Sequence, residues 1–98
     1  MQEQKIDINL SEEVAQGTYA NLAIITHSDN EFILDFVAML PGLPKGNVRS
    51  RIILTPQNTK RLLSALNENV RKFEEKNGRI DDHQSGMFPM MSGDGGIA

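Results

Sequence analysis

The chain has 98 residues, enough for one small domain, and its 39% hydrophobic and 23% charged residues argue against a wholly disordered protein. It has no cysteine, which excludes disulfides, thiolate zinc sites and cysteine nucleophiles and favours a reducing compartment. No apolar run is long enough to span a bilayer and no secretory signal opens the chain, so we expect a cytoplasmic protein without a membrane partner.

The net charge of −3 conceals a segregation along the chain. Residues 1–35 carry seven acids and one lysine, whereas residues 36–79 carry nine basic residues and three acids. The last residues, 80–98, add three aspartates. A chain divided in this way either neutralises its halves across one sheet or presents a basic face to a partner, and the charges alone leave both interpretations open.

The first predicted strand covers residues 6–10, where apolar side chains alternate with polar ones in the sequence KIDINL. The polar residues 1–5 before it are expected to be disordered, because they are terminal and offer nothing to bury. The segment SEEVAQG then interrupts the strand, and Gly17 allows a backbone conformation that other residues resist.

A β-hairpin is predicted next, from residues 18–27 and 31–40 joined by the turn-forming sequence SDN. In its second strand Phe32, Leu34 and Phe36 point to one face and the residues between them to the other. Two prolines and two glycines in PGLPKGN end the hairpin, because neither residue type continues a strand well. A further strand follows at residues 48–55.

Thr55 and Pro56 mark the start of a long helix, since threonine caps free amides and proline fits the first helical turn. The helix is expected to run to about Lys76 and to stop at Asn77–Gly78. Its apolar positions form one stripe about a hundred degrees wide. These positions are Leu62, Leu63, Leu66, Val70 and Phe73, with Thr59 on the same side.

The predicted fold class is therefore α+β, a small antiparallel meander of about four strands followed by one long C-terminal helix. Residues 6–78 are expected to form the single domain, and residues 79–98 a disordered tail rich in glycine and methionine. The apolar cluster from Met87 to Met91 in that tail is either inert or a short anchor for a partner.

One helix covers only one face of such a sheet, yet the central strands carry apolar side chains on both faces. The uncovered face is predicted to include Ile25, Ile33, Val37 and Ile53. A patch of this kind indicates either a homodimer or docking on another protein. The alternative is that the N-terminal segment or the tail folds over the second face.

No residue set is predicted to be catalytic. His27, Ser28 and Asp29 lie together at the hairpin turn, but neighbours so close rarely reach triad geometry, and nothing nearby builds an oxyanion hole. The second histidine, His83, lies in the tail, so a two-histidine metal site is not expected. Asp35 is expected to pair across the sheet with Arg49 or Arg51. We therefore expect no enzyme, cofactor, metal or small-molecule substrate.

The best candidates for a nucleic-acid or partner contact are basic side chains around the third predicted strand and the helix start. Phosphate contact would require these side chains to share one face. Aromatic residues that could stack on bases are scarce, with one tyrosine and four phenylalanines. The basic candidates are Lys45, Arg49, Arg51, Lys60 and Arg61.

Three stretches carry a family resemblance, namely GTYANLAIITHS, EFILDFVAMLPG and RSRIILTPQNTKRLLSALNENVRKFE. Spanning roughly residues 14–75, they resemble small uncharacterised bacterial and archaeal proteins grouped as domain of unknown function 3467. The family name implies no activity. Members from one bacterial phylum are associated with genes beside those of the large RNA polymerase subunits, so the resemblance implies a small companion of the transcription machinery.

The leading hypothesis is thus a non-catalytic protein-interaction module, a small accessory subunit associated with RNA polymerase or a similar assembly. Two alternatives rest on arrangement alone, because four strands and a helix also form the Pur-type repeat and the core of the SecB export chaperone. The first alternative is a dimeric Pur-like single-stranded nucleic-acid-binding protein. The second is a SecB-like chaperone that holds unfolded clients on its apolar face.

Overall fold

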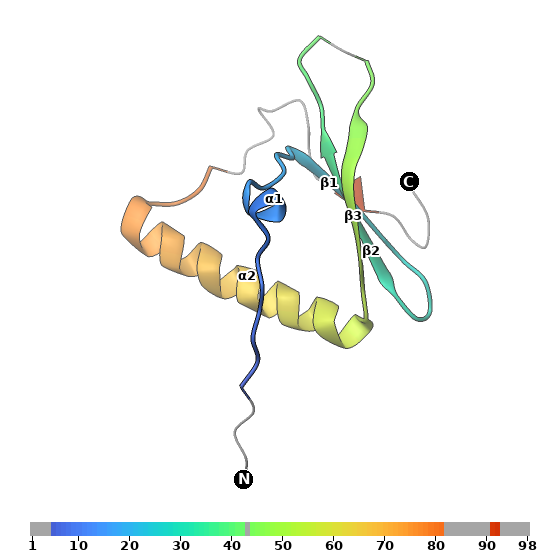
Figure 1. Cartoon of the computed structure of the whole chain (residues 1–98). Coiled ribbons are helices and arrows are strands. Elements are labelled where there is room, and N and C mark those ends of the chain that lie inside the picture. Colours follow the sequence, from blue (N-terminus) through green and yellow to red (C-terminus); the bar gives the residue numbers. More distant parts are fainter. Residues whose placement is uncertain (1–4, 43, 82–90, 93–98) are drawn as a thin grey trace.

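The three-dimensional structure is a computed structural model that describes residues 5–42, 44–81 and 91–92 (Figure 1). A three-stranded antiparallel sheet forms its centre, built from β1 (Leu22–His27), β2 (Phe32–Ala38) and β3 (Asn47–Leu54). The long helix α2 (Pro56–Asn77) follows the sheet directly. The predicted α+β meander with a C-terminal helix is confirmed, but the meander has three strands and not four.

The sheet order is β3–β2–β1–β4, in which β4 (Met91–Ser92) is a two-residue strand parallel to β1. The hairpin register places Ile25 opposite Leu34 and His27 opposite Phe32. On the other side of β2, Asp35 lies opposite Arg51, and a β-bulge interrupts the ladder between Phe36 and Val37. This register decides which side chains share a face.

Local hydrogen bonds explain why the hairpin forms where it does. At the turn, the Ser28 hydroxyl accepts hydrogen bonds from the amides of Asn30 and Glu31. At the open end, the Asn21 side chain donates to the Met39 carbonyl at 2.9 Å and accepts from the Met39 amide at 3.0 Å. Polar residues therefore fix both ends of the β1–β2 pair.

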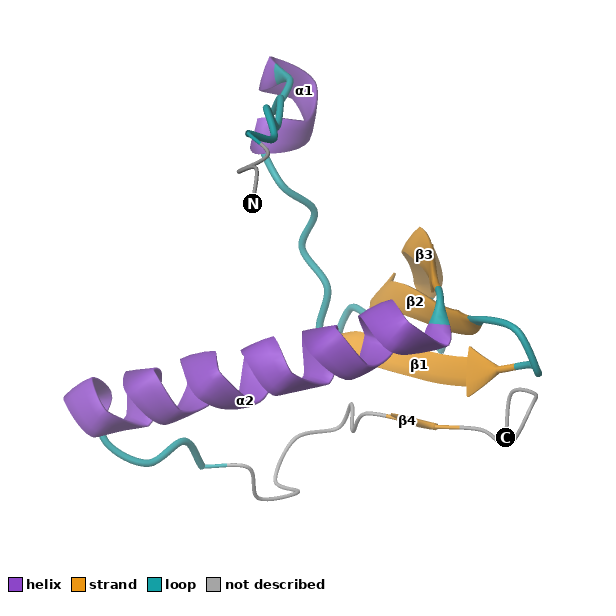
Figure 2. Ribbon diagram, turned by 90° about the horizontal axis from the view of Figure 1, so that it is seen from below, coloured by secondary structure: helices purple, strands orange, loops and turns teal. Residues whose placement is uncertain are grey.

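The helix α2 has both of the boundaries that its sequence predicts. The Thr55 hydroxyl accepts a hydrogen bond from the Asn58 amide at 3.2 Å, and Pro56 occupies the first helical position. At the other end Gly78 has a φ of 91°, and its amide donates to the Glu74 carbonyl. Figure 2 shows that α2 begins beside the sheet and then runs past it.

The strand predicted over residues 6–10 is wrong. These residues form no helix or strand, and Ile6, Ile8 and Leu10 are exposed by 75%, 85% and 68%. The alternating pattern is present, but no strand of the described chain pairs with it. The interrupting segment forms a short helix, α1 (Glu12–Ala15), in which the Ser11 hydroxyl accepts from the Val14 amide.

The predicted domain limits, 6–78 with a disordered tail at 79–98, stay a prediction, as does disorder of residues 1–5. Most of the predicted apolar cluster of the tail, including Met87 and Phe88, lies outside the described residues, and only Met91 belongs to β4.

The small hydrophobic core lies in β1 and β2. Its buried hydrophobic residues are Leu22, Ala23, Leu34 and Val37.

Candidate interaction surfaces

The apolar stripe of α2 is exposed to solvent. Leu63, Leu66 and Phe73 are exposed by 62%, 53% and 52%, and none of the 22 helix residues is buried. The stripe forms because apolar residues recur at helical spacing on one side. A monomer rarely leaves such a continuous stripe in water, so α2 is a candidate interaction surface.

A groove of about 440 Å³ lies where the first half of α2 passes over the sheet. Residues of β1 and β2 form its floor, and residues from the first half of α2 form its wall. The lining is almost entirely apolar, with the Lys60 side chain among it. The lining residues are Ile25, Phe32, Leu34, Pro56, Thr59, Lys60, Leu62, Leu63 and Leu66.

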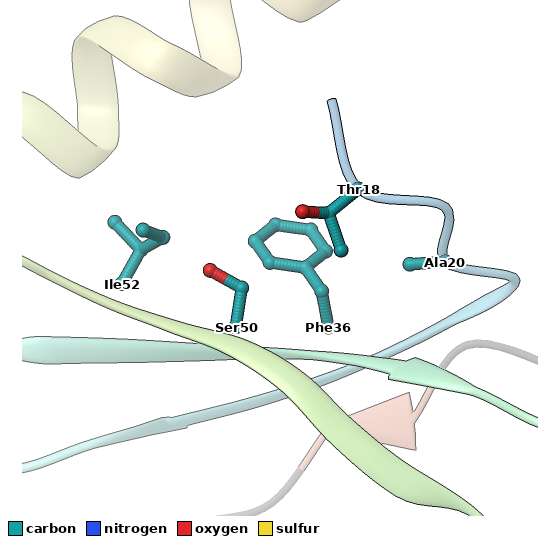
Figure 3. A pocket seen from close by; sticks show the side chains of 5 residues that line it. All are labelled: Thr18, Ala20, Phe36, Ser50 and Ile52. Atoms are coloured by element: carbon teal, nitrogen blue, oxygen red, sulfur yellow. The ribbon is translucent and has the colours of Figure 1, made fainter. Parts of the chain in front are cut away.

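A second hollow of about 290 Å³ lies on the same face of the sheet, farther along β2 and β3. Figure 3 shows Phe36, Ser50 and Ile52 rising from the strands, with Thr18 and Ala20 from the segment before β1 on the other side. Ile52 is exposed by 42%. The helix side of the sheet therefore offers a second, shallower apolar hollow.

The opposite face carries an ion pair between β2 and β3. It confirms that Asp35 pairs across the sheet, and of the two predicted candidates the partner is Arg51. The Arg51 Nε donates to Asp35 Oδ1 at 2.6 Å, and Nη2 donates to Oδ2 at 2.9 Å. The Asp35 side chain is 4% exposed and that of Arg51 57%. These hydrogen bonds, together with the charge of Arg51, lower the pKa of Asp35 against the opposing effect of burial. Asp35 in turn raises the pKa of Arg51.

The predicted apolar patch is only partly present, because its four members lie on two faces. Ile33, Val37 and Ile53 share the face opposite the helix, where Val37 is buried and Ile53 is 55% exposed. Ile25 was expected with them, but its register with Leu34 turns it toward the groove. With an ion pair at its centre, the opposite face is not a continuous apolar patch.

The predicted basic candidates do not share one face either. Arg51 is engaged with Asp35, whereas Lys60 lines the groove on the other side of the sheet. Arg61 is exposed on α2 and donates to the Asn58 side chain at 3.3 Å. Lys45 and Arg49 are exposed in the β2–β3 loop and on β3. A phosphate-binding row from Lys45 to Arg61 is therefore divided by the sheet itself.

The histidine and serine of the hairpin turn make local contacts. The His27 ring stacks on Phe32 with centroids 5.3 Å apart, and the Ser28 hydroxyl serves the turn. Among residues 5–42, 44–81 and 91–92, no three acidic or histidine side chains cluster to hold a metal. None of the described helices is long and apolar enough to cross a membrane.

The sequence indicated the apolar stripe but not that its second half lies clear of the sheet. One available signal was length. A helix of 22 residues extends about 33 Å, whereas strands of 6 to 8 residues extend about 20–26 Å. A single helix of that length therefore extends past the sheet beside it, as Figure 2 shows for α2. Val70 and Phe73 belong to the second half of this helix.

Comparison with known proteins identifies the family of the chain. A family model described as "Protein of unknown function (DUF3467)" covers residues 1–82, which confirms the resemblance drawn from the sequence. No curated protein and no solved structure matches the chain.

Proposed function

Because the chain belongs to the DUF3467 family, whose description assigns no activity, we propose its function from geometry, as a non-catalytic protein-interaction module. The carrying observation is the apolar stripe of α2, half of which lies beyond the sheet while the other half borders an apolar groove. Burying such side chains releases about 25 cal/mol per Å² of apolar surface. A second polypeptide that covers the stripe would therefore bind with a favourable hydrophobic contribution to the free energy.

The larger assembly that we propose as the partner is RNA polymerase, on the basis of the family resemblance. The outer side of β3 supports a contact of this kind, because it carries exposed basic and apolar residues at the edge of the sheet. Arg49 is exposed in the bulged part of the strand, and Val48 and Ile53 are each 55% exposed. The module would thus have two contact surfaces, one on α2 and one on β3.

The Pur-like nucleic-acid alternative has less support. Its phosphate contacts need several cations on one face, and Arg51 and Lys60 lie on opposite faces. The chaperone alternative draws on the same apolar groove as the leading proposal. It differs in predicting that many unrelated unfolded chains bind, whereas an interaction module binds few partners.

The test is capture of partners by the tagged full chain from its own cells at physiological salt. RNA polymerase subunits should be recovered, and their absence would overturn the polymerase proposal. Phe73→Asp reports on the helix surface and Arg49→Glu on the β3 surface. Ser64→Asp, on the exposed polar side of α2, is the matched control for the added negative charge and should capture normally.

Two further measurements separate the alternatives. Titration of labelled single-stranded DNA and RNA against salt should show no tight, salt-sensitive binding, because a Pur-like protein would lose affinity steeply with ionic strength. A reduced, unfolded model client should not be held in solution by an excess of the protein. Either positive result would replace the leading proposal with the corresponding alternative.

A further inference from the structure

We propose that the apolar surface of α2 is occupied by α2 of a second copy of this chain, packed antiparallel. This inference rests on the proposed function, in which that surface binds a polypeptide, and it names the polypeptide. Three features of the helix support a second copy: the spacing of the stripe, the position of α2 relative to its own sheet, and the charges that flank the stripe.

The stripe has the spacing of a helix that pairs with another helix. Leu63, Leu66, Val70 and Phe73 follow one another at intervals of three, four and three residues. Such an alternation places side chains along one seam, at the a and d positions of a heptad repeat. All four are at least 41% exposed, so the seam is open along its whole length.

The position of α2 selects the antiparallel direction. The first half of the helix borders the groove over its own sheet, and the second half extends past the sheet (Figure 2). An antiparallel partner lays its free second half along the first half of this helix, next to the groove. A parallel partner would instead bring two sheets to the same end of the pair and leave both free halves without a sheet to cover them.

The antiparallel register also places side chains of opposite charge beside each other. With the two-fold axis beside Glu68, Leu66 packs on Val70 of the second copy, and Leu63 packs on Phe73 of the second copy. This register brings Lys60 next to Glu74 of the second copy, and the symmetry repeats the pair at the other end. Lys60 lines the groove beside the seam, and the Glu74 carboxylate accepts a hydrogen bond from the Ile80 amide of its own chain at 2.9 Å.

The first experiment measures the mass of the purified full chain across a concentration series by sedimentation velocity. A dimer of two 10.9 kDa chains is expected. Phe73→Asp should weaken dimerisation at least about tenfold, because it places a charge in the seam. Since Phe73 is half exposed in the single chain, this variant should keep the far-UV spectrum of the fold. Ser64→Asp should dimerise normally.

The second experiment tests the charge match. Lys60→Glu and Glu74→Lys should each weaken the dimer about two- to tenfold, since each removes two attractive pairs and adds two repulsive ones. The double variant should recover most of the affinity. Arg61→Glu makes the same charge change one residue along but outside the seam, and should have no effect. Failure of the double variant to recover would overturn the register.

The third experiment tests direction. The chain has no cysteine, so a single spin label can be placed at the exposed position of Gln57 through Gln57→Cys. The antiparallel register separates the two labels by about 33 Å along the helix axes. A parallel pair would hold them at about the 10 Å that separates neighbouring helices. A short label distance would overturn the antiparallel arrangement.

The outcomes distinguish this inference from the proposed function. A chain that stays monomeric when purified, yet captures a partner through Phe73, overturns the second-copy inference and leaves the interaction module intact. A dimer that depends on Phe73 but captures no further protein supports the inference and counts against an accessory role. A dimer that is insensitive to both Phe73→Asp and the charge changes overturns the assignment of α2 as the interface.

Discussion

The centre of the sheet and the second half of α2 differ in whether the chain itself supplies their neighbours. In the sheet, Leu34 is 7% exposed and Asp35 is 3% exposed. Arg51 donates two hydrogen bonds to the buried Asp35 carboxylate. In the helix, Val70 and Phe73 are 41% and 52% exposed in a segment of equally regular backbone. Regular, well-capped secondary structure is therefore no sign that tertiary packing is complete, because capping and hydrogen bonding are local while burial needs a second element.

The largest effect is expected in the sheet. Leu34→Ala should lower the free energy of unfolding by about 2–5 kcal/mol, because it removes buried methyl groups and leaves a cavity on the helix side of the sheet. Urea denaturation at a concentration where the chain is monomeric measures this loss. Leu66→Ala deletes the same atoms from an exposed position and is the matched control, with a much smaller expected loss. Equal losses of stability in the two variants would contradict the difference in packing between the sheet and α2.

The next effect comes from the ion pair and depends on pH. Hydrogen bonds from Arg51 hold the pKa of Asp35 below its ordinary value of 3.8, so near that pH the unfolded chain binds more protons than the folded one. The stabilisation is therefore complete above the ordinary pKa and is lost as the pH falls through the lowered one. Asp35→Asn should destabilise the protein at neutral pH, but less than Leu34→Ala, because the freed guanidinium is mostly exposed.

The measurement is urea denaturation of the wild type and of Asp35→Asn between pH 7 and pH 2. The difference between the two free energies of unfolding should be constant at neutral pH and should shrink below about pH 4. Asp29→Asn, in the exposed β1–β2 turn, removes a carboxylate without this partner and serves as the control. A difference that does not change with pH would show that the pair contributes nothing through ionisation.

A smaller effect is expected at the start of α2. Thr55→Ala removes the hydroxyl that accepts from the Asn58 amide and should cost about 1 kcal/mol of stability. Thr55→Ser keeps the acceptor and should retain most of the stability. Thermal or urea unfolding followed by circular dichroism at 222 nm checks both variants. A Thr55→Ser variant as unstable as Thr55→Ala would assign the loss to packing and not to the cap.

The smallest effect is expected in the second half of α2. Under monomeric conditions Phe73→Ser should change the free energy of unfolding by no more than about 0.5 kcal/mol, as for other surface substitutions. At higher concentrations the same variant should remove the concentration dependence of the wild-type unfolding curve. A loss of several kcal/mol in the monomer would mean that the helix is already packed within the single chain.

The elements that could be predicted from the sequence are those with local causes. The hairpin follows from alternating residues around a turn whose Ser28 hydroxyl binds two amides, and the helix follows from Thr55 at one end and Gly78 at the other. The Asp35 pairing was also predictable, because a mid-strand acid and an arginine-rich neighbouring strand leave few alternatives. In each case the decisive contacts lie close in sequence or between adjacent strands.

The features that could not be predicted depend on distant partners or on register. Residues 6–10 have the alternation of a strand, but a strand also needs a neighbour, and none of the described chain supplies it. The face of Ile25 depends on how the hairpin turn aligns it with Leu34, and a shift by one residue would reverse it. The open stripe of α2 depends on the direction in which the helix leaves the sheet.

The bulge between β2 and β3 has a consequence for solubility. Strand β3 ends the described sheet, so its outer backbone amides and carbonyls could template stacking of further chains into fibrils. The bulge at Phe36–Val37 twists this border locally, and the exposed Arg49 adds a charge that repels the Arg49 of a second β3. Straightening the border by deleting Arg49 should therefore make the protein prone to precipitate, even where its fold survives.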